Sequence, residues 1–322
     1  MSKLNFYNVN TLLTHKVTIE FPDIYFTPEY GKACEYSDNA VWELCSYKDL
    51  IYVYLKQPIE YNNTIYYDLI TPYGYSGYYY EIKETYEEFI PNFRKVAKEK
   101  KYITEVVRQN PYLNIKLKGY DVITSKTIYG VFVDSYENYY KNVLHSKKRN
   151  MITKANKNNL MFELKHIDCD EFNNNFLQLY YENMKRVDAS PYYFFNTEYF
   201  NEIKKQKNTF LAIIKDSNKN IIGTAILFLY NNYIHYHLSC NNNSINCITD
   251  FLLVNVIKEM GINKLFILGG GLKNDDALSK FKKRLSNKQY NYTIYKNILN
   301  QEIYDKLSEN FDTNYFPKYR SK

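Results

Sequence analysis

The second half of the chain alternates strand and helix patterns in an order that restricts its fold. From Met161, MFELKHI alternates apolar and polar residues like a strand, and the next segment has apolar residues at helical spacing behind an acidic first turn. The predicted order is β-α-α-β-β-β-α-β-α-β, an α+β domain on a mixed α/β sheet. Its elements are expected at residues 161–167, 170–187, 196–206, 209–217, 221–230, 233–239, 248–261, 264–271, 275–285 and 290–299.

The first half follows a similar but noisier pattern, which makes a second, degenerate copy of the same domain plausible. Helix patterns occur in EYGKACEYS and TYEEFIPNFRKVAKEKK, and strand patterns in VWELCS, LIYVYLKQ, IYYDLI and ITEVVRQN. A length of 322 residues suits two domains of about 150 residues each. We predict an N-terminal domain at 1–140, a basic helical linker at 141–160 and a C-terminal domain at 161–322.

Charge and cysteine usage limit the cellular setting. The net charge of +7 favours anionic partners such as phosphates, nucleic acid or an acidic membrane surface. Five scattered cysteines without a Cys-x-x-Cys pair indicate a reducing compartment. The sequence has neither a signal-peptide core nor a run of about 18 apolar residues. We expect a cytoplasmic protein without a transmembrane segment, which meets the inner membrane only at its surface.

Four sequence blocks together resemble the Fem family of peptidoglycan cross-bridge aminoacyltransferases. The blocks are YFTPEYGKACE, DLITPYGYSG, HSKKRNMITKANKNN and LGGGLKNDDALSKFKKRL. The element order resembles a GNAT acyltransferase domain, and HYHLS with the triple glycine is closer to the branch linked to surface-polysaccharide biosynthesis. The resemblance implies two tandem GNAT-like domains. It also implies transfer of an aminoacyl or acyl group to an amine of a cell-envelope precursor by direct attack, without a metal.

The acyl donor is left open by two opposing observations. GNAT enzymes that bind coenzyme A carry a glycine-rich pyrophosphate loop after the fourth strand, but this position reads SCNNNSINCITD and has no glycine. That favours aminoacyl-tRNA, although asparagine also adopts left-handed backbone conformations. Fem enzymes carry a coiled-coil arm that is missing here, which disfavours tRNA. Both acyl-CoA and aminoacyl-tRNA therefore remain candidates.

Lys282 and His237 are the candidate catalytic residues. Lys282 follows a phenylalanine where the resemblance implies a lysine that stabilises the oxyanion of acyl transfer, and a fixed cation there is worth several kcal/mol. The alternative is that the run of basic residues forms one solvated helix face, made of Lys280, Lys282, Lys283 and Arg284. His237, with His235 on the same strand face, can deprotonate the attacking amine. Two histidines satisfied by hydrogen bonds explain the pattern equally well.

Lys32, Arg186 and Tyr73 are the candidate acceptor-binding residues. Lys32 matches the early lysine that the resemblance implies in the acceptor cleft, and the Arg186 guanidinium suits a phosphate. Tyr73 belongs to the turn TPYGYSG, which can line a sugar site. The expected acceptor is an anionic sugar nucleotide, a lipid-linked amino sugar or a muropeptide. Each of these residues is equally compatible with a structural or surface role.

Gly269, Gly270 and Gly271 follow a strand and precede a helix. Their pattern is neither G-x-G-x-x-G nor G-x-x-x-x-G-K-[ST], so a nucleotide loop is excluded. A substrate-lining turn or a sterically required corner both explain three glycines. Asp275 and Asp276 both suit a cap of the following helix, and the alternative is that one of them accepts a hydrogen bond from the acceptor amine.

A different class of function rests on the basic stretch from His145 to Lys157. This densest basic patch can bind tRNA, other RNA or acidic lipid headgroups electrostatically, without any catalysis. Such a module would lose affinity steeply with salt and would tolerate replacement of Lys282. The charge has no recognised nucleic-acid motif beside it, so the enzyme is the favoured interpretation.

Overall fold

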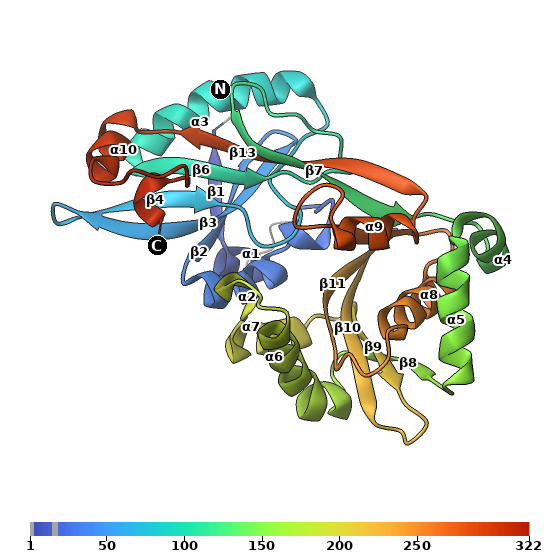
Figure 1. The fold of residues 1–322 in the computed structure, drawn as a ribbon. Coiled ribbons are helices and arrows are strands. Elements are labelled where there is room, and N and C mark those ends of the chain that lie inside the picture. The colour runs from blue at the N-terminus through green and yellow to red at the C-terminus, as the bar shows by residue number, and fades with distance from the viewer. Residues whose placement is uncertain (1–2, 15–18, 322) are drawn as a thin grey trace. The chain divides into compact units, whose positions relative to one another are not determined.

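The computed structural model describes residues 3–14 and 19–321 of the chain. Contacts divide the chain into two compact units, Met1–Ser125 with Tyr292–Lys322 and Lys126–Asn291. The chain therefore leaves the first unit in mid-sequence and returns to it at the end, whereas the sequence suggested boundaries at residues 140 and 160. Figure 1 shows the elements of both units along the chain.

The first unit contains a mixed sheet in the strand order β1-β2-β3-β4-β6-β13, with β5 paired to β3. β4 and β6 are parallel, with α3 between them in sequence, and the other pairs are antiparallel. The strands are β1 (Asn5–Asn8), β2 (Val41–Tyr47), β3 (Leu50–Tyr61), β4 (Thr64–Ile70), β5 (Tyr78–Tyr79), β6 (Tyr102–Arg108) and β13 (Lys288–Ile298). Only the part of β13 from Tyr292 onward belongs to this unit, and its first residues belong to the second unit. The helices are α1 (Val9–Thr14), α2 (Pro28–Asp38), α3 (Lys83–Glu99) and α10 (Gln301–Ser308).

The second unit contains a mixed sheet in the order β7-β12-β11-β10-β9-β8, in which only the β11–β12 pair of the described strands is parallel. Helices α5 and α8 lie side by side against this sheet (Figure 1). The strands are β7 (Asp121–Val131), β8 (Met161–His166), β9 (Thr209–Lys215), β10 (Ile221–Tyr230), β11 (Tyr233–Asn241) and β12 (Leu265–Gly270). The helices are α4 (Tyr136–Asn138), α5 (Ser146–Lys157), α6 (Leu177–Arg186), α7 (Thr197–Lys204), α8 (Ile248–Met260) and α9 (Ala277–Lys283).

The structure confirms the predicted element order from β8 to β13 and the mixed α/β class. In each unit, three antiparallel strands precede a helix and a parallel strand: β2-β3-β4-α3-β6 in the first and β9-β10-β11-α8-β12 in the second. In each repeat, the strand that comes after the parallel strand forms its hydrogen bonds with a strand of the other repeat. β7 follows β6 but pairs with β12, and β13 follows β12 but pairs with β6. The two repeats therefore exchange their last strands.

The stretch predicted as a linker is a packed part of the second unit. Within it, helix α5 buries Ile152 and Ala155 in the same apolar cluster as the α8 residues Leu253 and Ile257. Apolar residues at helical spacing explain this, because they place one face of the helix in the core, while all of its charged residues except Lys148 are at least partly exposed.

A carboxylate fastens the C-terminal segment to the first unit. Asp68 on β4 is 3% exposed and accepts hydrogen bonds from Thr104 (2.6 Å), Tyr319 (2.6 Å) and Arg320 (2.9 Å). Arg320 also donates to the carbonyl oxygens of Gln57 and Pro58. A buried charge is tolerated only when it is paired and hydrogen-bonded, and this site meets both conditions.

Candidate functional site

The parallel strands β11 and β12 separate partway along their length. In the described part of the chain they are in register at only three residue pairs, Tyr233–His235 with Leu265–Ile267. β11 also carries a bulge, because Leu238 and Tyr236 pair with successive residues of β10 and His237 between them is skipped. Bulges often occur beside active sites, where they redirect a side chain. The carboxyl ends of β11 and β12 are therefore the candidate position of an active site.

His237 makes a short hydrogen bond to a residue that the sequence analysis did not identify. Its Nε2 lies 2.6 Å from the hydroxyl of Tyr199 on α7, and both side chains are buried. Phe195 stacks on Tyr199, and Phe228 packs against the His237 ring. Burial, and then the neighbouring His235, lower the pKa of His237 well below its ordinary value. The imidazole is therefore neutral at pH 7, which is the form that a general base requires, and burial at the same time makes it a weaker base.

Lys282 is set apart from the other cations of its helix. It is 8% exposed, and its Nζ donates to the carbonyl oxygen of Gly270 at the end of β12 (2.8 Å), whereas Lys280 and Lys283 are exposed. Burial lowers the pKa of Lys282 to about 8, and the Asp276 carboxylate offsets part of this. This geometry does not fit one solvated basic face. It gives the unit a buried, oriented amine that is still mainly cationic at pH 7.

Each of the three glycines has a steric reason in this structure. Gly269 has a φ of 76°, which side chains rarely tolerate. A Cβ on Gly270 would lie 2.6 Å from the Thr127 carbonyl oxygen on β7, and one on Gly271 would clash with the Asp276 carboxylate. The corner itself therefore requires all three glycines, and their backbone brings the Gly270 carbonyl to Lys282.

Asp276, rather than Asp275, caps helix α9. Its carboxylate accepts from the backbone N–H groups of Leu272 (2.7 Å), Lys273 (3.0 Å) and Ser279 (2.6 Å). These bonds are the first cause of the lowered Asp276 pKa, since they stabilise its charged form. Asp275 is exposed and has a φ of 61°. It remains a predicted acceptor contact.

Arg186 lies at the carboxyl end of β11. Its guanidinium donates to the Asn241 carbonyl oxygen (3.0 Å) and to the Asn183 side chain. In the loop that follows, Asn241 and Asn242 accept with their side chains from the N–H groups of Asn243 (2.8 Å) and Ser244 (3.0 Å). Asn243 has a φ of 57°, so an asparagine here does adopt the left-handed conformation. Two N–H groups of the loop are thereby used locally instead of being presented to a phosphate.

Lys32 and Tyr73 belong to the first unit, whereas the other candidate residues belong to the second. Lys32 on α2 forms an ion pair with Glu35 (2.9 Å), and its amine lies 5.2 Å from the Tyr36 ring centroid. The Tyr73 carbonyl oxygen accepts from the hydroxyl of buried Tyr30 (2.8 Å). Both residues are held in place within their own unit.

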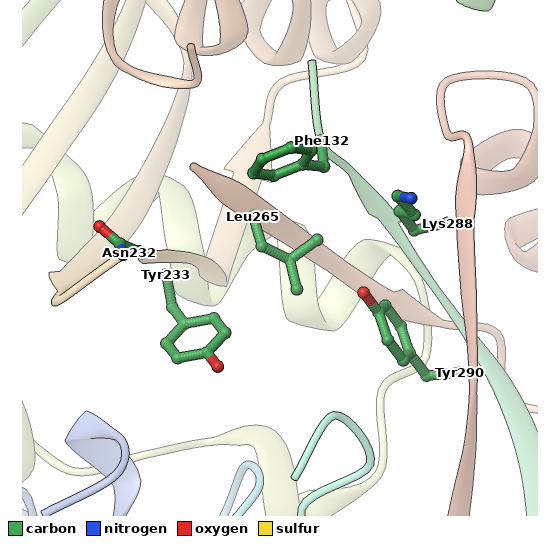
Figure 2. A pocket seen from close by; sticks show the side chains of 6 residues that line it. All are labelled: Phe132, Asn232, Tyr233, Leu265, Lys288 and Tyr290. Carbon is green, nitrogen blue, oxygen red and sulfur yellow. The ribbon is translucent and has the colours of Figure 1, made fainter. Parts of the chain in front are cut away.

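An open hollow of about 300 Å³ lies at the other end of β11 and β12 from Gly270. Figure 2 shows aromatic rings around the central Leu265, with the Lys288 amine at one side. The buried titratable side chains His237, Tyr199 and Lys282 lie instead at the carboxyl ends of β11 and β12. The candidate site is therefore placed at the carboxyl ends and not at the hollow. The hollow is lined by Phe132, Asn232, Tyr233, Leu265, Lys288 and Tyr290.

The basic stretch uses several of its charges internally. Lys148 is buried against Asp250, Arg149 donates to the carbonyl oxygen of Leu144, and Lys154 donates to the Asn246 side chain (2.7 Å). The Asp250 carboxylate offsets the charge of Lys148, whereas Arg149 and Lys154 keep their charge because their acceptors are neutral. Across residues 3–14 and 19–321, no group of three or more His, Cys, Asp or Glu side chains is placed to hold a metal ion. Within the described ranges, no helix is both long and apolar enough to cross a membrane.

The chain is similar to known proteins in its three-dimensional structure, but its sequence matches none of the family models or curated proteins compared. No family model matches the chain, and no curated protein matches it by sequence. FemX has a TM-score of 0.64 at 12% identity, over 93% of this chain and 97% of FemX. The C-terminal domain of a protein described as a lysylphosphatidylglycerol synthetase from Agrobacterium fabrum has a TM-score of 0.56 at 13% identity, over 85% and 88%. L-PGS from Bacillus licheniformis has a TM-score of 0.53 at 17% identity, over 75% and 80%.

Identities this low establish a common fold and nothing finer. The predicted mixed α/β class is confirmed, and the chain shares its fold with these proteins. The placement within a polysaccharide-linked branch stays a prediction.

Proposed function

We propose that the protein is an acyltransferase that moves an aminoacyl or acyl group from an activated ester or thioester to an amine. The observation that carries this proposal is the buried Lys282 amine, directed at the Gly270 carbonyl where β11 and β12 have separated. A preorganised cation in a water-poor site stabilises developing negative charge far better than one in solvent. The common fold with FemX supports the same class of reaction.

In the proposed mechanism, the acceptor amine attacks the acyl carbonyl carbon directly. The new C–N bond forms while the carbonyl oxygen becomes an oxyanion, which the Lys282 ammonium stabilises in place of its bond to Gly270. The amine loses a proton to the Tyr199 oxygen as the Tyr199 proton passes to Nε2 of His237. The C–O or C–S bond then breaks, and the leaving group takes up the proton held on His237, which returns through the Tyr199 hydroxyl and leaves the imidazole neutral again. No covalent enzyme intermediate is needed.

The proposed acceptor is an amine on an anionic cell-envelope precursor, which is a sugar nucleotide, a lipid-linked amino sugar or a muropeptide. In the second unit, Arg186 would bind its charged group and Asp275 its amine, while Lys32 and Tyr73 are predicted acceptor contacts within the first unit. Such an acceptor is met in the cytoplasm or at the inner membrane surface. The locally bonded β11–α8 loop supports an aminoacyl-tRNA donor over acyl-CoA, because its N–H groups would have to release their asparagine partners to hold a pyrophosphate.

A ligand panel tests the function and separates the two donors. Bound ligand stabilises the folded state, so the melting temperature is measured with acyl-CoAs, charged tRNA, UDP-amino sugars and a UDP-muramoyl peptide. We expect stabilisation by charged tRNA and by one acceptor. Stabilisation by acyl-CoA alone would keep the acyltransferase and overturn the donor. Salt-sensitive binding of uncharged RNA, with no stabilisation by any donor or acceptor, would overturn the enzyme.

Replacing Tyr199 by phenylalanine should lower kcat by about 10²-fold, because it removes the proton path to His237 while keeping the aromatic stacking. The melting temperature should change by only a few degrees, in line with loss of one hydrogen bond worth about 1 kcal/mol. Steady-state kinetics and a thermal scan of the same sample measure both quantities. The control is Tyr192→Phe on the preceding loop, for which kcat should not change. A Tyr199→Phe enzyme with normal kcat would remove this pair from the mechanism.

The rate should fall as the pH rises through the pKa of Lys282. Only the ammonium form stabilises an oxyanion, and burial lowers its pKa from 10.5 to about 8. The loss therefore begins near pH 8 and well below the pH at which an exposed lysine would titrate. Lys282→Arg should move this alkaline limb upward, because arginine stays protonated throughout. If the rate falls at the same pH in the unchanged protein and in Lys282→Arg, a group other than Lys282 causes the fall.

A further inference from the structure

The most basic stretch of the sequence contains one lysine that is turned into the protein. Lys148 on α5 is 6% exposed, whereas the adjacent Lys147 is exposed. The Lys148 amine lies 2.6 Å from a carboxylate oxygen of Asp250, in the first turn of α8, and Asp250 is 4% exposed. Burial lowers the pKa of Lys148 and raises that of Asp250. Burying these two charged groups therefore costs desolvation free energy.

The same amine is also bound to the helix that carries Lys282. The Lys148 Nζ lies 3.6 Å from the ring centroid of Phe281 on α9. This is close contact for a cation–π interaction, which gains strength when the cation is desolvated. Arg284, the residue that follows α9, contributes to lowering the pKa of Lys148 by its like charge. Phe281 is the residue immediately before Lys282.

Two hydrogen bonds to backbone carbonyl groups hold the end of α9 to the segment around α5. The His145 N–H donates to the Arg284 carbonyl oxygen (3.1 Å). The hydroxyl of buried Tyr139 donates to the Leu285 carbonyl oxygen (3.1 Å). These bonds fix where α9 ends, and a buried bond between the Ser279 and Tyr129 hydroxyl groups (3.0 Å) also ties one side of the helix to β7. A helix of only seven residues has little intrinsic stability, so its rotation depends on side-chain contacts.

We propose that the buried Lys148–Asp250 pair is a positioning device for Lys282, which holds Phe281 and thereby sets the rotation of α9 that directs the Lys282 amine to the end of β12. Buried ion pairs are weak stabilisers, and apolar replacements of similar volume are often as stable or more stable. A role in orienting a neighbouring group therefore explains the pair better than stability does. The proposal rests on the proposed function only in treating Lys282 as catalytic.

The test uses the full chain and reads Lys282 without requiring substrates. In Lys148→Met/Asp250→Leu both charges are removed together, so that neither is left buried alone. Each protein is labelled with trace acetic anhydride between pH 6 and pH 11, and the rate at Lys282 is measured by tandem mass spectrometry against exposed Lys280. In the unchanged protein we expect a slow rate that titrates near pH 8. In the double variant we expect a several-fold faster rate and titration of Lys282 at a higher pH.

The matched control is Lys147→Met, which removes an exposed charge from the adjacent position and should leave the Lys282 titration unchanged. Phe281→Leu keeps the ion pair and removes only the ring, so it should act in the same direction as the double variant, and it provides the reading if the double variant does not fold. With substrates, kcat should fall by about 10²-fold at nearly constant KM, as for a misplaced catalytic group. Unaltered labelling of Lys282 in folded variants would overturn the proposal, whether or not the protein is an acyltransferase.

Discussion

Replacing Lys282 by methionine should lower kcat by about 10²–10³-fold, the cost of removing one oxyanion-stabilising group. Methionine has nearly the same length and is apolar, so it can occupy the buried position while losing the charge and the bond to the Gly270 carbonyl. The melting temperature should stay the same or rise, because a buried amine is exchanged for an apolar side chain. Single-turnover kinetics with saturating donor isolate the chemical step.

Lys283→Met is the matched control for Lys282→Met, because it removes an equal charge from the exposed neighbour on α9. It should leave kcat unchanged. If both variants lose activity equally, the relevant property is the overall charge of α9 rather than a single oriented amine. If neither loses activity, Lys282 has no part in the reaction.

Replacing Asp68 by alanine should destabilise the first unit by about 3–5 kcal/mol, the range for breaking a buried ion pair by removal of one partner. The substitution leaves Arg320 without its carboxylate, and it removes the acceptor of the Thr104 and Tyr319 hydroxyl groups. The free energy of unfolding is measured from urea titrations, in which the midpoint should fall while the slope stays constant. Fluorescence of Trp42 reports this unit, since it is the one tryptophan of the sequence.

Asp305→Ala is the control for Asp68→Ala, because it removes an exposed carboxylate from α10 in the same unit. Its effect should stay within about 0.5 kcal/mol. A loss below about 1 kcal/mol for Asp68→Ala would mean that the C-terminal segment is not fastened through this carboxylate. In that case, deletion of residues 315–322 should also have little effect on stability.

Local pattern predicted the elements of the second unit well, because each segment has one strong hydrophobic period. The apolar run before Gly269 and the amphipathic pattern of α8 are examples. Pattern could not predict that β7 and β13 exchange between the repeats, since strand pairing at long sequence separation depends on tertiary contacts. The domain boundaries differ from the sequence-based ones for that reason.

The sequence could predict a site residue where a motif marks a chemically suitable side chain. It could not predict a site residue whose role depends on being buried in the folded protein. Lys282 was singled out by its place after a phenylalanine, but only the structure separates it from Lys283. Tyr199 occupies an ordinary inner position of a helix, and nothing in the sequence distinguishes it from the many other tyrosines. Lys148 was grouped with a solvated basic patch because burial of a single lysine in such a run requires a partner from a distant segment, here Asp250.

The most direct test of the account is transfer of a labelled aminoacyl group from charged tRNA to an amine acceptor, compared between the unchanged protein and Lys282→Met. The product is followed as an amide that resists mild alkaline hydrolysis, which releases the amino acid from its ester to tRNA. The account predicts amide formation with the unchanged protein and about 10²–10³-fold slower formation with the variant. Equal rates of amide formation by the two proteins would contradict it.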